Sequence, residues 1–286
     1  MGRGVEGHEG QLKINPAQAQ RSAARLPGTA TNPQRMPNME EQQVLIEKRE
    51  RVLWITINRP ARRNALTPTV LEELFKAMQQ IHSDTDLLAA VITGTGDKAF
   101  CAGADLEPGK TFARDYSKPS TIIADVFRLA RSAPIPLIAR VNGARLAGGI
   151  GLMAVCGMAV ATDDAIFGLQ VFSALQPLVP RRQLYEWCVT GEAFDARTAK
   201  EAGLINYVVP RAELDAKVDQ LLARITDKSP AAMRRGIYAM RQADAMHFEQ
   251  SLAYMESQLG TISLTGDAKE GLAAFAEKRK PVWKGR

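Results

Sequence analysis

The sequence predicts an α/β fold in which a parallel sheet is followed by a helical region. Apolar runs of strand length alternate with segments of helical periodicity between residues 44 and 167. One such run enters a glycine-rich turn followed by small apolar residues, VNGARLAGGIGLMAVCGMAVAT, at 141–162. From residue 181 onward most segments have helical spacing. Strands that alternate with helices imply crossover connections, and such connections join parallel strands.

Local patterns predict the first elements. Residues 44–47 and 52–57 alternate apolar and polar side chains around a charged turn, which predicts a hairpin. Thr67 precedes apolar residues at helical spacing, so we expect it to cap a helix over 68–81. The other elements expected before the helical region are strands at 88–93, 137–141, 158–161 and 165–167 and a helix over 121–131.

The apolar segment around 146–161 is interrupted by glycines and is too short to span a bilayer, so we expect a buried helix there. The C-terminal part should contain helices at 181–189, 196–202, 212–225, 230–243, 246–259 and 267–280, with a short strand at 207–209.

Composition is that of an ordinary globular chain. The 286 residues are 45% hydrophobic and 24% charged, with a net charge of +6. Half of this excess positive charge lies in residues 1–38, which contain five basic and two acidic side chains. A nucleic-acid-binding protein needs its basic residues on a folded face, so this distribution argues against that class. A modest positive bias suits a phosphate-rich substrate.

The cysteines and histidines indicate neither disulfides nor a metal. Three cysteines are far apart and form no CxxC pair, which favours a reducing compartment, and we expect a cytoplasmic location. Three histidines show no metal-ligand spacing.

Residues 1–40 are expected to form a disordered extension, because they are rich in Gly, Ala, Gln, Pro and Arg and lack aliphatic periodicity. A targeting peptide is the alternative, since no acidic residue occurs between Gln11 and Asn38. A secretory signal is disfavoured because there is no apolar core.

Four further stretches resemble one known family. They are NRPARRNAL at 58–66, KAFCAGADL at 98–106, TGEAFDARTAKEAGLINYVVP at 190–210 and FAEKRK at 275–280. Together with the glycine-rich stretch they resemble the enoyl-CoA hydratase/isomerase (crotonase) superfamily from about Val44 to the C-terminus. The resemblance implies a crotonase-like spiral of ββα units over 41–228. It also implies a helical trimerisation region over 229–286, and a homotrimer or dimer of trimers.

The resemblance implies an acyl-CoA thioester substrate in fatty-acid or related metabolism, with coenzyme A as part of the substrate and no separate cofactor. The thioester oxygen of such substrates is held by two backbone N–H groups, which match Ala104 and Gly148. Donors fixed in this way stabilise the charge of an enolate or tetrahedral intermediate.

The resemblance implies that coenzyme A binds at the basic turn within 61–66 and at the CAGAD stretch. The residues implied are Arg62, Arg63, Ala65, Ala102, Asp105 and Leu106, with Lys98 as a further phosphate contact. A solvated basic turn is the alternative for the cations, and a turn-stabilising carboxylate is the alternative for Asp105.

The reacting groups of the family are missing. Two glutamates usually serve as acid and base in hydration. Their positions are occupied by Gly151 and Val171. Other carboxylates (Glu107, Asp115, Asp163, Asp164, Glu186 and Glu192) are weak candidates, and Gln170 and Ser173 could only orient a water. Cys101 is more typical of a packing residue than of a nucleophile.

Two functions therefore remain open. The first is an acyl-CoA lyase or isomerase of this family, with isomerisation, thioester hydrolysis and decarboxylation as alternatives to hydration. The second is a catalytically weak acyl-CoA-binding paralogue.

A chain that begins at Met39 is expected to keep the thermal midpoint and the CoA affinity of the full-length chain, because the first strand pattern starts near Val44. Thermal unfolding and calorimetric titration check this. Loss of solubility or of cooperative unfolding on truncation would show that the segment packs on the fold.

Overall fold

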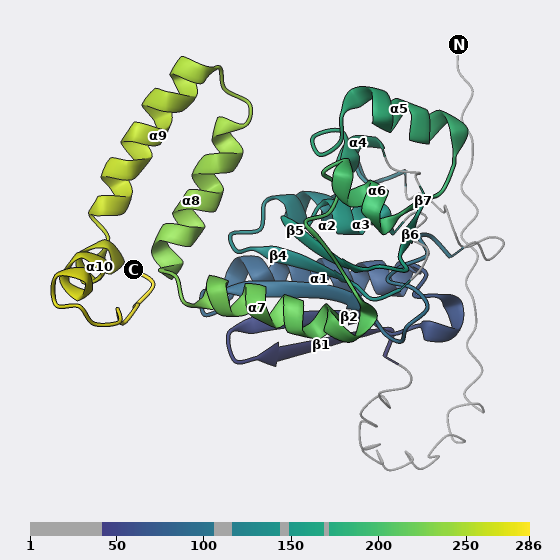
Figure 1. The fold of residues 1–286 in the computed structure, drawn as a ribbon, viewed down its shortest axis with the longest axis horizontal. Coiled ribbons are helices and arrows are strands. Elements are labelled where there is room, and N and C mark those ends of the chain that lie inside the picture. Colours follow the sequence, from purple (N-terminus) through teal and green to yellow (C-terminus); the bar gives the residue numbers. More distant parts are fainter. Residues whose placement is uncertain (1–41, 106–115, 144–148, 169–171) are drawn as a thin grey trace, which may run out of the picture. The chain divides into compact units, whose positions relative to one another are not determined.

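The computed structural model describes residues 42–105, 116–143, 149–168 and 172–286 (Figure 1). All of them belong to the unit Asn38–Arg286. Its centre is a six-stranded sheet in the order β1-β2-β3-β4-β5-β8. The strands are β1 (Val44–Arg49), β2 (Val52–Ile57), β3 (Ala89–Gly94), β4 (Leu137–Val141), β5 (Met158–Thr162) and β8 (Tyr207–Val209).

The predicted hairpin and the predicted parallel sheet are both confirmed. β1 and β2 pair antiparallel, with Val44 opposite Ile57 and Arg49 opposite Val52. All later neighbours in this sheet pair parallel. β3 is buried along its whole length, which is why it contains no polar alternation.

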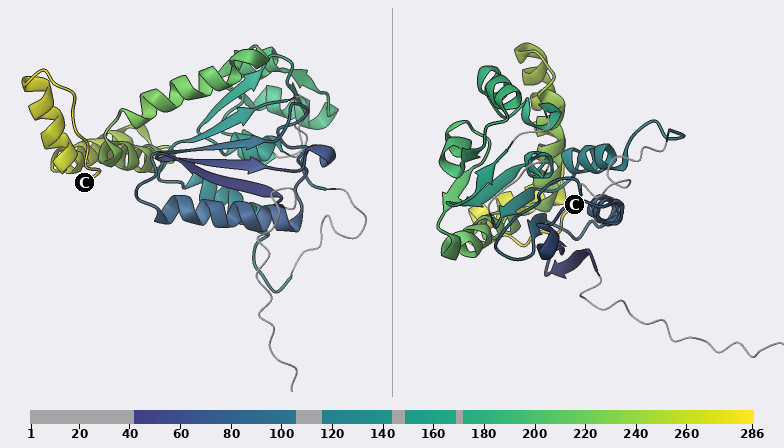
Figure 2. Two further views of the ribbon diagram at one scale, coloured as in Figure 1. Left: turned by 90° about the horizontal axis from the view of Figure 1, so that it is seen from below. Right: turned by 90° about the vertical axis from the view of Figure 1, so that its right-hand side faces the viewer.

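Helices cover both faces of the sheet, as the left view of Figure 2 shows. On one face α1 (Pro68–Ser83) and α2 (Ile122–Arg131) pack over Leu53, Ile55 and Ile92 of the sheet. α7 (Leu214–Thr226) crosses the other face, over Val91 and Ile138 among others. The Thr67 cap is confirmed, because its Oγ1 accepts a hydrogen bond from Val70 N at 3.1 Å. Such caps contribute about 1 kcal/mol.

The expected buried helix is much shorter than its apolar segment. α3 covers only Ile150–Ala154, and β5 begins at Met158. The second half of the apolar run is strand because it pairs with β4 and β8 in the interior of the sheet. Periodicity alone does not separate a buried strand from a buried helix.

A small second layer follows. β6 (Ile166–Phe167) pairs with β7 (Phe194–Asp195), and β7 was not predicted. Phe194 stacks on Trp187 with ring centroids 3.7 Å apart. The helices of this layer are α4 (Phe172–Leu175), which was not predicted, α5 (Arg181–Thr190) and α6 (Ala196–Glu201).

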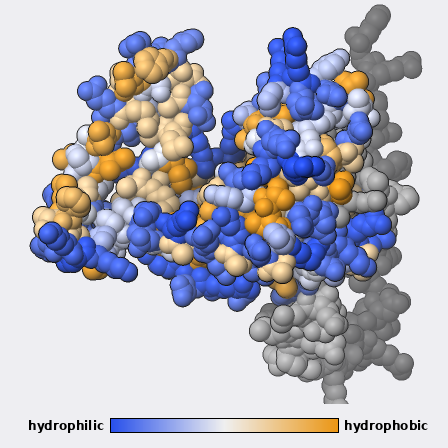
Figure 3. All heavy atoms as spheres, in the orientation of Figure 1, coloured by the Kyte–Doolittle hydropathy of each residue, from blue (hydrophilic) through white to orange (hydrophobic). Residues whose placement is uncertain are grey.

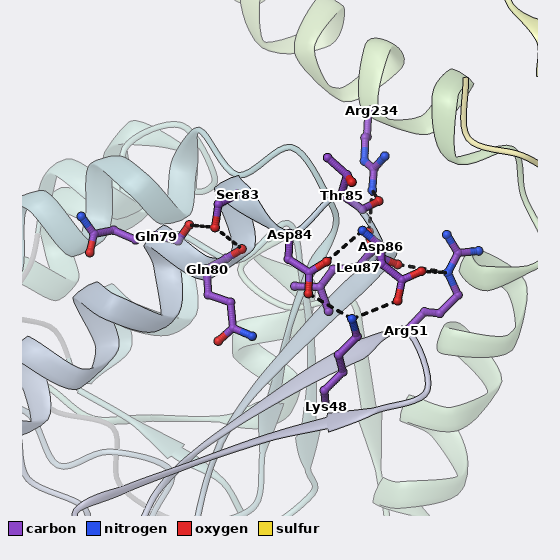
Figure 4. A network of polar contacts seen from close by, with 10 residues as sticks. All are labelled: Lys48, Arg51, Gln79, Gln80, Ser83, Asp84, Thr85, Asp86, Leu87 and Arg234. Atoms are coloured by element: carbon purple, nitrogen blue, oxygen red, sulfur yellow. Dashed lines mark hydrogen bonds and ion pairs between the residues drawn. The ribbon is translucent and has the colours of Figure 1, made fainter.

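The chain ends in α8 (Pro230–Ala243), α9 (Phe248–Ser263) and α10 (Gly266–Ala276), which pack on one another (Figure 1). Two arginines of α8 hold the group to the sheet domain. Arg234 donates to the carbonyls of Thr85 and Leu87, beside the ion pairs that Lys48 and Arg51 form with Asp84 and Asp86 (Figure 4).

The second of these arginines is Arg241, whose Nη1 donates to Ala133 O at 2.6 Å.

Buried Asp267 accepts from the N–H groups of Lys284 and Gly285 and from Ser229 Oγ, which fixes the C-terminal residues against the start of α8.

The C-terminal helices carry many exposed apolar side chains, which Figure 3 shows on the visible face of α8 and α9. Phe275 is 86% exposed and Phe248 75%. The others are Tyr238, Met240, Leu252, Met255, Leu259, Leu264 and Leu272. Large exposed apolar patches mark interaction surfaces in soluble proteins. Within the described ranges, no helix combines the length and the hydropathy that a membrane crossing requires.

Candidate functional site

Five parallel strands end at one edge of the main sheet. These ends are Ile57, Gly94, Val141, Thr162 and Val209. In open α/β sheets ligands bind outside the carboxyl ends of the strands. The motifs at 58–66 and 98–105 and the turn at 142–143 lie at this edge, because each comes after a strand that ends there.

Asn64 ties the turn after β2 to the loop after β3. It has a left-handed φ of 56° and a fully buried side chain. Its Nδ2 donates to Thr95 O at 3.0 Å and to Ala99 O at 2.7 Å, while its Oδ1 accepts from Arg59 N. Asparagine suits this position because it tolerates the left-handed region and satisfies buried backbone groups.

Asp105 is paired within the protein. Its Oδ2 accepts from Arg59 Nη1 at 2.9 Å and its Oδ1 accepts from Arg62 Nη2 at 3.4 Å. Arg59 Nη1 also donates to Ala65 O at 2.8 Å. Sequence reasoning did not identify Arg59, although its place two residues after the end of β2 was the available signal. The expected turn-stabilising role of Asp105 fits this geometry.

A single parallel bridge joins the two motifs. Leu66 N donates to Gly103 O at 2.7 Å, and Asp105 N donates to Leu66 O at 2.9 Å. Since Leu66 uses the groups on either side of Ala104, the Ala104 N–H points away from the bridge. No acceptor for this N–H occurs in the described part of the chain. Ala104 therefore presents a fixed, available donor at the sheet edge.

Asn142 ties the turn after β4 to the end of β3 and the loop that follows it, as Asn64 does for the turn after β2. Its Nδ2 donates to Gly94 O at 2.7 Å and to Gly96 O, and its Oδ1 accepts from Thr93 Oγ1 at 3.3 Å. The next residue, Gly143, lies so close to the β3 loop that a Cβ there would be 2.5 Å from Asp97 O. The turn predicted at 142–143 is thus packed directly on the loop that leads to the CAGAD motif.

Gly149 fixes the other end of the glycine-rich stretch. A Cβ at Gly149 would lie 2.1 Å from Cys101 O, so only glycine allows this approach. Its φ of −67° is ordinary, so the requirement is close contact and not backbone conformation. Gly149 and Cys101 therefore bring the two motifs together.

A pocket of about 220 Å³ opens beside these motifs. It is lined by Pro60, Ala61, Asn64, Thr95, Gly96, Asp97, Lys98 and Ala99. Arg62 and Arg63, at the end of the turn that begins at Pro60, are exposed. The pocket thus combines backbone groups with one cation, Lys98, and one carboxylate, Asp97, and two more cations lie nearby in the sequence.

The structure brings most of the predicted site residues together. Ala102 N donates to Arg63 O at 3.0 Å, and Ala65 O accepts from Arg59, so both of these backbone groups already have internal partners. Three predicted residues, Leu106, Gly148 and Val171, lie outside the described residues.

Gly151 lies buried in α3 and brings no side chain to the site. Among the carboxylates considered as substitutes, those that the structure describes are used elsewhere or exposed. Asp164 pairs with Arg211 at 2.5 Å, and Glu186 and Glu192 are exposed. Glu107 and Asp115 lie outside the described residues.

The two buried thiols are poor nucleophiles. Burial raises the pKa of Cys101 and that of Cys156 to about 12. At neutral pH both are therefore protonated, and the thiol is not the reactive form. This agrees with the expected packing role of Cys101.

Comparison with known proteins indicates the same family as the sequence motifs. Residues 47–286 match the family model described as enoyl-CoA hydratase/isomerase. The chain is 33% identical over 260 residues to the enoyl-CoA hydratase EchA19 of Mycobacterium tuberculosis, an alignment that covers 85% of this chain and 96% of that protein. It is 31% identical over 254 residues to the short-chain-enoyl-CoA hydratase of Clostridium acetobutylicum, with 85% and 97% covered.

A solved enoyl-CoA hydratase of Mycobacterium smegmatis superposes with a TM-score of 0.78 at 34% identity, over 85% of this chain and 99% of that one. That of Bacillus anthracis gives 0.78 at 29% identity, over 86% and 100%. The motifs, the sheet and these similarities agree: the chain belongs to the enoyl-CoA hydratase/isomerase (crotonase) family and has its fold.

Proposed function

We propose that the protein binds an acyl-CoA thioester with its carbonyl oxygen between the N–H groups of Ala104 and Gly148, and that its reaction is not ordinary hydration. The observation that carries the proposal is the Leu66–Ala104 bridge, which leaves the Ala104 N–H fixed and available. A fixed donor stabilises developing negative charge without reorganisation, and one such donor is worth about 10²–10³-fold in rate.

The pocket beside Lys98 supports a coenzyme A site. Its size and its mixture of backbone groups with a cation fit the adenosine end of the molecule. Arg62 and Arg63 add positive potential near the phosphates. Asp105 acts indirectly in this proposal, by holding Arg59 and Arg62.

The residues at the two acid–base positions support the proposal that the reaction is not ordinary hydration. Gly151 and Val171 carry no group that transfers a proton. A reaction that depends on the oxyanion donors more than on a base, such as decarboxylation, fits this site better than hydration does.

A panel of enoyl-, β-hydroxyacyl- and malonyl-type CoA thioesters tests the proposal. We expect calorimetric titration to show binding of the thioesters, and turnover of at least one class. Binding without turnover of any member would support the weak paralogue instead. No binding of any thioester would refute the proposed function.

The protein is also proposed to assemble as a trimer or a dimer of trimers through the exposed apolar side chains of α8, α9 and α10. Light scattering at micromolar concentration should give three or six times the chain mass. A monomer mass would contradict this prediction.

A further inference from the structure

Arg59 contacts both segments of the bridge that presents Ala104. It lies two residues after the end of β2. Its Nη1 donates to Ala65 O at 2.8 Å and to Asp105 Oδ2 at 2.9 Å. Ala65 immediately precedes Leu66, one of the two bridge residues. Asp105 immediately follows Ala104, the other, so the guanidinium holds the neighbour of each.

Two peptide units connect the guanidinium to the proposed donor. Ala65 O and Leu66 N belong to one planar peptide, and Leu66 N donates to Gly103 O at 2.7 Å. Gly103 O and Ala104 N belong to a second planar peptide. Since the C=O and N–H of a trans peptide point in opposite directions, a chain of hydrogen bonds runs from Arg59 to the Ala104 N–H. All of its atoms belong to described residues.

A cation at the start of this chain of hydrogen bonds makes the N–H at its end a stronger donor. Hydrogen bonds in a chain polarise one another, by about 10–30% per bond. The cation is little screened by solvent, because the side chains of Arg59 and Asp105 are only 17% and 11% exposed. The Asp105 carboxylate opposes the effect only in part, since it also pairs with Arg62 at 3.4 Å.

We infer that Arg59 orients and polarises the Ala104 N–H, and is thus a positioning residue for the thioester oxygen. The inference rests on the proposed function, in which that oxygen lies against Ala104. Arg59 acts through the two peptide units and is not assigned a contact with the substrate. Loss of a whole oxyanion donor costs about 10²–10³-fold in kcat, and a donor that is only weakened should cost about tenfold.

The coenzyme A pocket has separate support. Its wall at 95–99 is held by the two hydrogen bonds of Asn64, to Thr95 O and Ala99 O. Asn64 is bound in turn by the main-chain N of Arg59, which a side-chain substitution leaves in place. Loss of the Arg59 guanidinium should therefore weaken the response of the thioester carbonyl while the affinity for free CoA changes little.

Arg51 offers a control with the same kinds of contact at the opposite end of β2. Its Nε donates to the main-chain oxygen and to the carboxylate of Asp86, at 3.0 and 3.1 Å (Figure 4). Arg51→Met therefore removes a similar pair of bonds without touching the peptides that lead to Ala104. Because Arg59 is the more buried of the two, Arg59→Met should be the less stable variant. Both are assayed below the temperature at which either begins to unfold.

The test uses cinnamoyl-CoA, a conjugated thioester whose absorption band moves to longer wavelength when hydrogen bonds polarise its carbonyl. We expect a red shift on binding to the wild type and to Arg51→Met, and a clearly smaller shift in Arg59→Met. The kcat of Arg59→Met on the best thioester of the panel should fall about tenfold, with KM little changed, because the donor counts most where charge develops. Arg59→Lys should lie in between, since it keeps the charge but not the planar guanidinium.

A wild-type shift and kcat in folded Arg59→Met would overturn the positioning role and leave the proposed function intact. An equal loss of shift in Arg51→Met would also overturn it, because the shift would then follow stability alone. If Arg59→Met does not fold, Arg59→Gln decides the question. It also removes the guanidinium and its charge but keeps an amide donor for one acceptor, and an unchanged shift there overturns the role. A wild type that binds no thioester would refute the proposed function and the inference together.

Discussion

Gly149→Ala is expected to cost at least about 10²-fold in turnover of the best thioester substrate, because it displaces the two motifs relative to each other. The added Cβ would lie 2.1 Å from Cys101 O, a backbone atom that has no side-chain freedom with which to yield. The chain at 101–104 or the start of α3 must shift instead. Overpacking of this kind also destabilises by about 1–3 kcal/mol. Steady-state kinetics and denaturant unfolding measure the two effects.

Gly157→Ala is the matched control for this substitution. A Cβ at Gly157 would have its nearest neighbour, Leu137 O, at 3.9 Å, which is an ordinary contact. Its kinetics and stability should stay close to those of the wild type. If Gly149→Ala behaved like Gly157→Ala, the close approach of the two motifs would not matter for the site.

Crotonyl-CoA hydration by the wild type is expected to be at least about 10²-fold slower than by a relative that carries both glutamates. One positioned acid or base contributes about 10²–10⁴-fold, and two that act as a unit are not multiplicative. The physical reason is that Gly151 and Val171 supply no proton-transfer group. Loss of enoyl absorbance under identical conditions measures both rates.

Gly151→Glu combined with Val171→Glu should recover part of the hydration activity, and either substitution alone should recover less. A wild-type rate within about tenfold of the relative would mean that another residue performs the proton transfer. The interpretation of Gly151 and Val171 as a lost pair would then be wrong.

Much of the fold follows from the sequence because the elements have clear local signals. β4, β8 and α8 begin and end where the sequence predicts them, each bounded by a proline, a cap or a change of period. The strand predicted at 158–161 is confirmed as β5. The short length of α3 did not follow, because the periodicity of the apolar segment around it is compatible with both a buried helix and a buried strand.

The candidate site was also predictable from the sequence only in part. The glycine motifs identified Ala104 and the basic turn as candidates, and the structure places both where parallel strands of the main sheet end. The side-chain hydrogen bonds that hold this edge together were not predictable. Arg59 reaches Asp105 and Arg211 reaches Asn142 across 46 and 69 residues of sequence. Such contacts depend on tertiary approach and leave no periodic pattern.

The central claim is that a thioester is held at the backbone donors with no carboxylate at its reacting carbons. A crystal structure of the protein with a bound acyl-CoA thioester tests it most directly. The account predicts the thioester oxygen at about 2.7–3.1 Å from the N atoms of Ala104 and Gly148, with the adenosine end beside Lys98. A thioester oxygen far from Ala104 N, or a carboxylate within hydrogen-bond distance of Cα or Cβ, would contradict it.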